Sequence, residues 1–229
     1  MAFLTTGSEV VDSDSRLPAG KIRNSNAHVI RGLIAEAHCI PVPLGNAPDD
    51  LQAIVGKMRE GFTGDALITC GGVSVGPLDL IPEALATTGC SISVRKVWIK
   101  PGMPFCFASG PQSHPIPIFC LPGNPVSAMV TFLEFVRPAL ETMSGTTGVD
   151  RTFELSASLE HDIVKNDSKL HLMRGIATLS RSSISVRSTG SQNSAVLTSL
   201  SKANCLIRIP EEVRSLKKGD SVHIELLSR

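Results

Sequence analysis

Residues Phe119–Ala128 read FCLPGNPVSA, and this short stretch decides the fold class. It joins the apolar run IPIFCL to the apolar pattern VSAMVTFLEFV. A strand that passes through a tight turn into a helix is typical of α/β proteins, whose ligands bind at the carboxyl ends of the strands. Asn124 suits an N-cap and Pro125 the first helical position, but capping does not explain Pro122 and Gly123. We interpret these two residues as a rigid backbone shelf that lets a ligand approach closely.

Outward from this stretch, apolar runs alternate with helical patterns. Strands are expected at residues 2–6, 39–45, 65–70, 92–99, 103–109 and 116–121, and helices at residues 25–37, 49–62, 80–89 and from Pro125 onward. Pro138 lies inside the last helical pattern and is expected to kink that helix or to end it early. The alternation predicts an α/β fold: a three-layer, mostly parallel sheet with helices on both faces.

From about residue 150 the pattern changes to short β-rich runs separated by Ser, Asn, Gly and Pro. Such spacing is typical of a small all-β domain, and we expect it to be barrel-like. We place the α/β domain at residues 1–147 and the C-terminal β domain at residues 148–229.

Composition argues against several classes of protein. The 229 residues carry a net charge of +1, with eight Phe, one Trp and no Tyr, which does not suit nucleic-acid binding. No apolar run is long enough for a membrane span. The six cysteines form no CxxC pair, so neither zinc nor a disulfide framework is indicated. Buried reduced thiols favour a reducing compartment, and we expect a cytoplasmic protein.

Loops that follow strands hold the candidate site residues. Gly71, Gly72 and Gly76 interrupt the segment GGVSVGPLD, where free backbone N–H groups suit an anion such as phosphate. Asp79 comes next, at a helix start, where it either complements the helix dipole or acts on a ligand. Glu9 follows the first strand and is either a solvated carboxylate or part of the same site.

A pair of lysines belongs to the segment RKVWIKPGMPF. If residues 94–99 form a strand, Lys96, Trp98 and Lys100 point to one face. Two positive charges would then lie together at the loop edge. The alternative is a pair of solvated lysines on an edge strand.

Taken in order, TTGSEV, GKIRNSN, PDDL, GGVSVGPLD, KPGMPF and LPGNPVSA resemble the molybdopterin molybdotransferases, the family of the gephyrin E domain. The later stretches MRG and STGSQNSAVLTSLSKANCLIRIP resemble the terminal β domain of that family. The resemblance implies insertion of molybdate into adenylylated molybdopterin with release of AMP, in a reaction that requires Mg²⁺. It also implies a homodimer.

Residue roles follow from the same resemblance. The implied catalytic residues are Glu9, Asp49 (or its neighbour Asp50), Asp79, Lys96 and Lys100, with Glu9 and Asp79 as metal ligands. The implied molybdopterin-binding residues are Gly71, Gly72, Ser74, Gly76, Pro122, Gly123, Asn124, Pro125 and Ser127. Carboxylates suit Mg²⁺ and an attacking water, and lysines suit molybdate.

The chain departs from the family pattern in two ways. Ser8 stands where the family usually has an acid in TGDE, and the family's N-terminal regions do not precede TTGSEV. In the family, an N-terminal region of the other subunit completes the cleft. Because of these departures, a non-catalytic, gephyrin-like scaffold that binds a receptor peptide stays open as an alternative. Two further alternatives share only the α/β domain: a molybdopterin adenylyltransferase, which has no β domain, and a relative of the damage-inducible nucleotide pyrophosphatases.

Overall fold

The computed structural model describes residues 1–73, 79–146, 155–181 and 183–227. The chain divides into two compact units. The first unit comprises Met1–Val97 and Pro104–Thr146, and the second comprises Trp98–Met103 and Thr147–Arg229. The short segment Trp98–Met103, which we assigned to the α/β domain from the sequence, thus belongs to the second unit.

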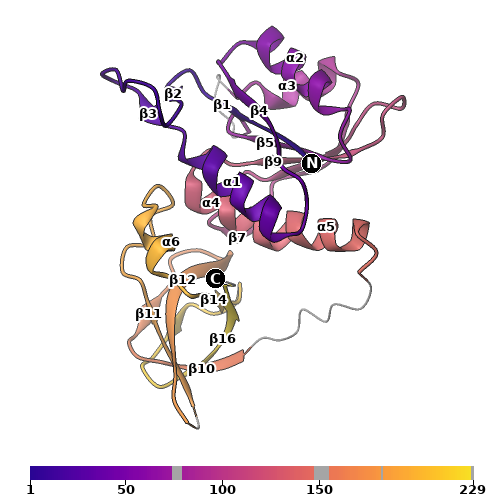
Figure 1. Ribbon diagram of the computed structural model, residues 1–229. Helices are drawn as coiled ribbons and strands as arrows, with labels where there is room; N and C mark the ends of the chain where they lie inside the picture. Colours follow the sequence, from indigo (N-terminus) through magenta and orange to yellow (C-terminus); the bar gives the residue numbers. More distant parts are fainter. Residues whose placement is uncertain (74–78, 147–154, 182, 228–229) are drawn as a thin grey trace. The chain divides into compact units, whose positions relative to one another are not determined.

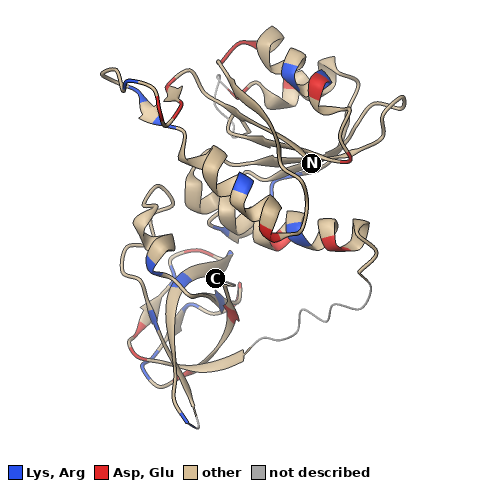
Figure 2. Cartoon of the chain, viewed as in Figure 1, with Lys and Arg blue, Asp and Glu red and all other residues tan. Residues whose placement is uncertain are grey.

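The first unit is built around a six-stranded sheet. Its strand order is β4 (Val42–Ala47), β1 (Ala2–Thr6), β5 (Leu67–Cys70), β9 (Pro117–Leu121), β8 (Cys106–Ser109) and β6 (Ser91–Arg95). Strands β4, β1, β5 and β9 run parallel, whereas β8 and β6 are antiparallel to their neighbours. All of these strands except β6 lack charged residues (Figure 2), as expected for a sheet covered on both faces.

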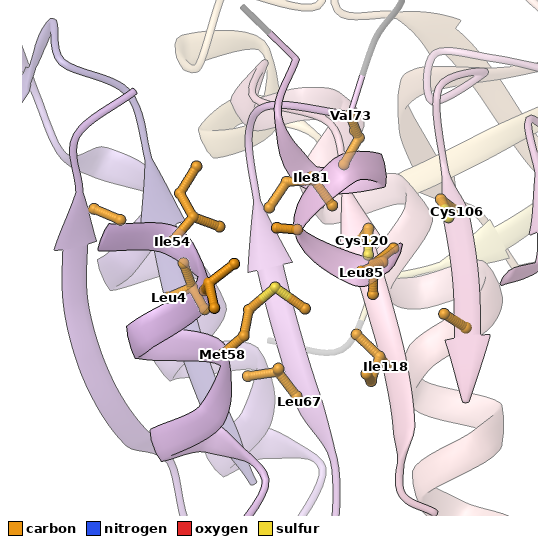
Figure 3. Close-up of a cluster of buried hydrophobic side chains, with 14 of the residues drawn as sticks. Leu4, Ile54, Met58, Leu67, Val73, Ile81, Leu85, Cys106, Ile118 and Cys120 are labelled. Atoms are coloured by element: carbon orange, nitrogen blue, oxygen red, sulfur yellow. The ribbon is translucent and has the colours of Figure 1, made fainter. Parts of the chain in front are cut away.

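Helices cover both faces of this sheet (Figure 1). They are α1 (Ser25–Glu36), α2 (Leu51–Gly61), α3 (Ile81–Thr87), α4 (Pro125–Thr131) and α5 (Arg137–Met143). Helix α1 packs against α4 on one face, and α2 packs against α3 on the other. Side chains of α2 and α3 pack onto β1, β5 and β9 in a buried apolar cluster that includes Leu4, Met58 and Ile118 (Figure 3). The predicted three-layer α/β architecture is confirmed.

The helix that begins at Pro125 is interrupted, as the sequence predicts. After α4 the chain forms a π-helical turn, η1 (Phe132–Val136), before α5 begins. Pro138 is near the start of α5 and has no N–H to donate, so a regular α-helical bond is lost at this point. The wider π turn accommodates that loss.

The second unit is a small barrel. Strands β13 (Ile184–Ser188), β10 (Leu155–Leu159), β16 (Ser221–Leu226), β14 (Cys205–Ile209) and β12 (Leu170–Leu179) pair in this order, and β13 also pairs with β12, which closes the ring. The second unit also contains helix α6 (Thr198–Lys202) and a small two-stranded sheet of β11 (Ile163–Val164) and β15 (Ser215–Leu216). A similar two-stranded sheet in the first unit pairs β2 (Val10–Val11) with β3 (Ile22–Arg23). The predicted barrel-like domain is confirmed.

The prediction of one strand over residues 92–99 is wrong. Strand β6 ends at Arg95, and Lys96 follows with a positive φ of 80°. The two-residue strand β7 (Ile99–Lys100) then pairs with β12 of the barrel. Lys96 and Lys100 therefore do not share a strand face: Lys96 belongs to the first unit and Lys100 to the second.

None of the helices that the structure describes combines the length and the hydropathy needed to cross a bilayer.

Candidate functional site

Three loops meet where β1, β5 and β9 end. The N–H of Gly71, just after β5, donates to the carbonyl of Leu121 at the end of β9 (3.0 Å). A Cβ atom on Gly123 would lie only 3.5 Å from the Cα of Gly71. The Pro122-Gly123 step therefore packs backbone to backbone against the glycine pair. We call the residues Thr6–Glu9, Gly71–Gly72 and Pro122–Asn124 the loop edge.

Glycine is required at the centre of the loop edge. Gly71 has a φ of +102°, and a Cβ there would lie 2.7 Å from Thr6 Oγ1 and 2.8 Å from the Thr6 carbonyl. Gly72 has a φ of +64°, and a Cβ there would lie 3.2 Å from both Thr6 Oγ1 and Ile81 Cγ1. Both φ values are unfavourable for residues with a Cβ. The edge therefore presents bare backbone because side chains do not fit.

Helix α1 holds the shelf formed by Pro122 and Gly123. Asn26 Nδ2 donates to the Gly123 carbonyl (2.7 Å), and the Cys70 thiol donates to the Pro122 carbonyl (3.4 Å). Burial raises the pKa of the Cys70 thiol to about 12, an effect that nearby Asn26 partly opposes, so the thiol stays protonated at neutral pH. Sequence reasoning noted the motif GKIRNSN but not Asn26 itself.

Asn24 explains the start of α1. Its Oδ1 accepts from the N–H of Ala27 (3.0 Å), and its Nδ2 donates to Thr5 Oγ1 at the end of β1 (2.8 Å). One side chain thus caps the helix and ties it to the edge of the sheet. Asn124, by contrast, occupies the N-cap position of α4 without making a side-chain capping bond. The predicted positions of Asn124 as N-cap and Pro125 as first helical residue are confirmed, although the Asn124 side chain adds no capping bond.

Thr6 is a polar residue that sequence reasoning missed. Its side chain is buried, and Oγ1 has no hydrogen-bond partner in the part of the chain that the structure describes. A buried hydroxyl without a partner costs about 1–3 kcal/mol. The same atom lies against the sites where Gly71 and Gly72 lack a Cβ. The strand-end motif TTGSEV was the available signal.

Ser8 and Asp49 hold each other through reciprocal bonds. The Ser8 N–H donates to Asp49 Oδ2 (2.8 Å), and the Asp49 N–H donates to Ser8 Oγ (2.9 Å). Asp50 is instead the N-cap of α2, since its side chain accepts from the N–H of Ala53 (2.8 Å). Asp50 thus caps a helix, whereas Asp49 binds the loop after β1, and we keep Asp49 as the candidate site residue.

The remaining predicted residues of the first unit are spread around this edge. Glu9 is exposed, and its carboxylate oxygen Oε2 lies 2.7 Å from the position that a Cβ on Gly7 would occupy. Asp79 is half-buried just before α3, and Ser127 is buried in the first turn of α4. Ser74 and Gly76 lie outside the described residues.

The metal ligands predicted from the resemblance are Glu9 and Asp79. Across the described ranges, which leave out residues 74–78, no three His, Cys, Asp or Glu side chains gather closely enough to hold a metal ion. Glu9 and Asp79 as ligands of Mg²⁺ stay a prediction, since this ion is commonly held by only one or two carboxylates together with substrate phosphates.

Lys100 belongs to a charged cluster of the second unit. Its Nζ lies 3.0 Å from Asp167 Oδ2, and His171 Nε2 lies 2.8 Å from Asp167 Oδ1. The Lys169 N–H donates to Oδ1 (3.1 Å), while its Nζ lies 4.0 Å from Oδ2. Partial burial acts to raise the pKa of Asp167, but the bonds from His171 and Lys100 outweigh it and hold that pKa well below its usual range.

Trp98 and Lys165 lie next to these residues. We use the name Asp167 cluster for the following six residues: Trp98, Lys100, Lys165, Asp167, Lys169 and His171. The Trp98 indole donates to the Ser168 carbonyl (2.7 Å), and Lys169 Nζ lies 4.8 Å from the centre of its ring. Lys165 is buried and donates to the carbonyls of Lys169 and Pro210. The sequence analysis named Trp98 and Lys100 but none of the other members, because no motif marks residues 165–171.

Comparison with protein families gives two matches. Residues 2–142 match a family described as a probable molybdopterin binding domain. Residues 156–227 match the MoeA C-terminal region, domain IV.

Individual relatives agree with these matches. The chain is 32% identical over 231 residues to a molybdopterin molybdenumtransferase of Haemophilus influenzae, covering 98% of this chain and 55% of that protein. It is 34% identical over 230 residues to one of Staphylococcus aureus strain Mu50, covering 99% and 53%. A molybdopterin biosynthesis moea protein from Pyrococcus horikosii superposes with a TM-score of 0.80 at 26% identity, covering 98% and 53%. The chain thus spans about half the length of these relatives.

Proposed function

Since the chain belongs to the family of probable molybdopterin binding domains, we propose that it acts in molybdenum cofactor biosynthesis, inserting molybdate into adenylylated molybdopterin with release of AMP. The match of residues 156–227 to the MoeA C-terminal region favours this over a molybdopterin adenylyltransferase, which would leave the barrel unexplained.

The observation that carries the proposal is the loop edge. A flat, polar heterocycle such as a pterin needs close approach to backbone groups, and glycine at positions 71, 72 and 123 keeps side chains off the backbone of the loop edge. Thr6 Oγ1, buried and without a partner among the described residues, lies directly against Gly71 and Gly72. Asn26 and Cys70 hold the Pro122-Gly123 step in place through their bonds to the carbonyls of Gly123 and Pro122.

Charged residues supply the chemistry in this proposal. The carboxylates of Glu9, Asp49 and Asp79 orient a water and accept its proton as it attacks the adenylyl phosphorus, with Asp49 held in place by Ser8. The bond from that phosphorus to the molybdopterin phosphate oxygen breaks, so that AMP leaves and molybdopterin keeps its phosphate. Lys96 and Lys100 are the candidates within this chain for binding the oxyanions of phosphate and molybdate. Ser74, Gly76, Asn124, Pro125 and Ser127 complete the set of residues that we assign to molybdopterin binding.

The proposed reaction also requires Mg²⁺, although the described residues contain no cluster of three or more His, Cys, Asp or Glu side chains. Carboxylate oxygens are the ligands that Mg²⁺ prefers, so Glu9 and Asp79 are the candidates within this chain. No catalytic step above depends on the ion. Its requirement is testable by comparing AMP release before and after treatment with EDTA, and after adding Mg²⁺ back.

Partners and location are also proposed. We expect a homodimer, contributions from a longer N-terminal region where one exists, and a cytoplasmic location. A gephyrin-like role in binding a receptor peptide is the alternative, and it predicts peptide binding without affinity for molybdopterin. Light scattering of the purified chain tests the oligomeric state.

The decisive experiment measures AMP. Purified chain is mixed with adenylylated molybdopterin, sodium molybdate and MgCl₂, and AMP is quantified by chromatography. Release that depends on molybdate supports the proposal. If neither AMP release nor binding of molybdopterin to the chain is detected, even with an N-terminal fragment of a relative added, the proposal fails.

A further inference from the structure

The Asp167 cluster contains more positive than negative charge. Lys100 Nζ lies 3.0 Å and Lys169 Nζ 4.0 Å from the same carboxylate oxygen, Asp167 Oδ2. Among the described residues, Asp167 is the one carboxylate within ion-pair distance of these two lysines. Lys165 adds a third ammonium group, buried nearby and bonded to backbone carbonyls. One carboxylate thus pairs with two lysines, while the charge of the nearby Lys165 also interacts with Glu211 and Glu212.

Asp167 occupies the place that an external anion would take. Its two oxygens accept from Lys100 Nζ, from His171 Nε2 and from the Lys169 N–H. Convergent donors of this kind suit a tetrahedral oxyanion equally well. The Lys100 side chain is 56% exposed, against 23% for Asp167, so an anion reaches the lysine from solvent.

We propose that Asp167 is an internal competitor for the oxyanion: its carboxylate occupies Lys100 and Lys169 until an oxyanion replaces it. This inference rests on the proposed function, because molybdate is the oxyanion that the reaction uses. Asp167 is a positioning residue here, since it acts on the anion through the lysines.

The sign of its effect follows from charge. A negative group within a few ångströms repels an incoming dianion and also neutralises one of the lysines that would attract it. Removing the negative charge while keeping the shape, as in Asp167→Asn, should therefore tighten the binding of oxyanions. In a partly exposed cluster we expect a gain of about tenfold in affinity at low salt, smaller at high salt.

The test is isothermal titration of the full chain with sodium molybdate. Asp167→Asn should lower the Kd by about tenfold. Asp162→Asn is the matched control: Asp162 pairs with Lys217 (2.8 Å) elsewhere in the same unit, so the variant loses the same charge and should bind molybdate as the wild type does.

A double-mutant cycle shows whether the effect passes through Lys100. In a Lys100→Met background, Asp167→Asn should change the Kd less than it does alone. Thermal unfolding of each variant confirms that the barrel is intact.

Other outcomes overturn the inference. Unchanged or weaker molybdate binding in Asp167→Asn would mean that the carboxylate only orients Lys100. The absence of molybdate binding in both the wild type and Asp167→Asn would exclude an oxyanion at the cluster, while titration with molybdopterin would still decide the proposed function separately.

Discussion

The loop edge and the Asp167 cluster differ in what they are made of. At the loop edge, glycines, prolines and buried uncharged groups define a backbone surface, and Thr6 Oγ1 lacks a partner among the described residues. In the Asp167 cluster, lysines, a histidine and a carboxylate pair with one another. Steric fit therefore dominates the first region and charge dominates the second. Changes of volume should harm the first region, whereas changes of charge, salt and pH should act on the second.

The largest effect is expected from Arg174, which tests whether polar side chains also carry the stability of the second unit. Its buried guanidinium donates to Ser199 Oγ (3.2 Å) and to the carbonyl of Asn193 (3.2 Å). Burial lowers its pKa to about 10, so it remains charged at neutral pH. Arg174→Ala should destabilise the protein by about 3 kcal/mol in urea unfolding. The exposed Arg187→Ala should cost less than about 0.5 kcal/mol, and equal losses would contradict this account.

A change of volume alone tests the loop edge. Gly71→Ala should destabilise the chain by about 2–3 kcal/mol and weaken molybdopterin binding, because its Cβ would lie 2.8 Å from the Thr6 carbonyl. Gly145→Ala is the control, since Gly145 also has a positive φ, of +79°, but no atom within 4 Å of the added Cβ. If both variants lose the same stability, φ strain rather than close packing explains the glycine.

A smaller effect separates binding from stability. Asn26→Ala removes the bond to the Gly123 carbonyl and should weaken molybdopterin binding by about fivefold, at a stability cost of about 1 kcal/mol. Asn204 is the control, because its side chain likewise bonds the backbone: Oδ1 accepts from the N–H of Ala177, and Nδ2 donates to the carbonyl of Ala177. Asn204→Ala should cost stability without changing titration with molybdopterin. Parallel losses of affinity in both variants would argue against a positioning role for Asn26.

The smallest expected effect is the pH dependence of the stability that Asp167 contributes. Because the pKa of Asp167 is held below its usual range, its pairing stabilises the fold above pH 4 and that contribution fades as the pH falls further. The stability gap between wild type and Asp167→Asn should therefore narrow between pH 6 and pH 3, as measured by urea unfolding. A gap that stays constant with pH would show that the ionised carboxylate is not the stabilising species.

The parts of the fold and of the site that were predicted correctly from the sequence are those marked by local patterns. The alternation of runs located β1, β5, β9 and their helices, and the Pro-Gly and Gly-Gly steps marked the loop edge. β7 was missed because a two-residue strand is defined by its partner β12, some 70 positions later, and not by any local pattern. The same pairing brings Lys100 to Asp167, so their contact was equally invisible. The bonds between Ser8 and Asp49 likewise depend on tertiary structure.

The position of β7 makes the barrel a discontinuous domain. Strand β7 is encoded between β6 and β8, so no single cleavage of the chain releases the second unit, ring and β7 together. A fragment cut after residue 147 would leave Ile99 and Lys100 behind and expose Leu170 and His171 as an unpaired edge, which invites pairing with another chain. Any recombination among relatives that exchanges the barrel must therefore exchange residues 98–103 with it.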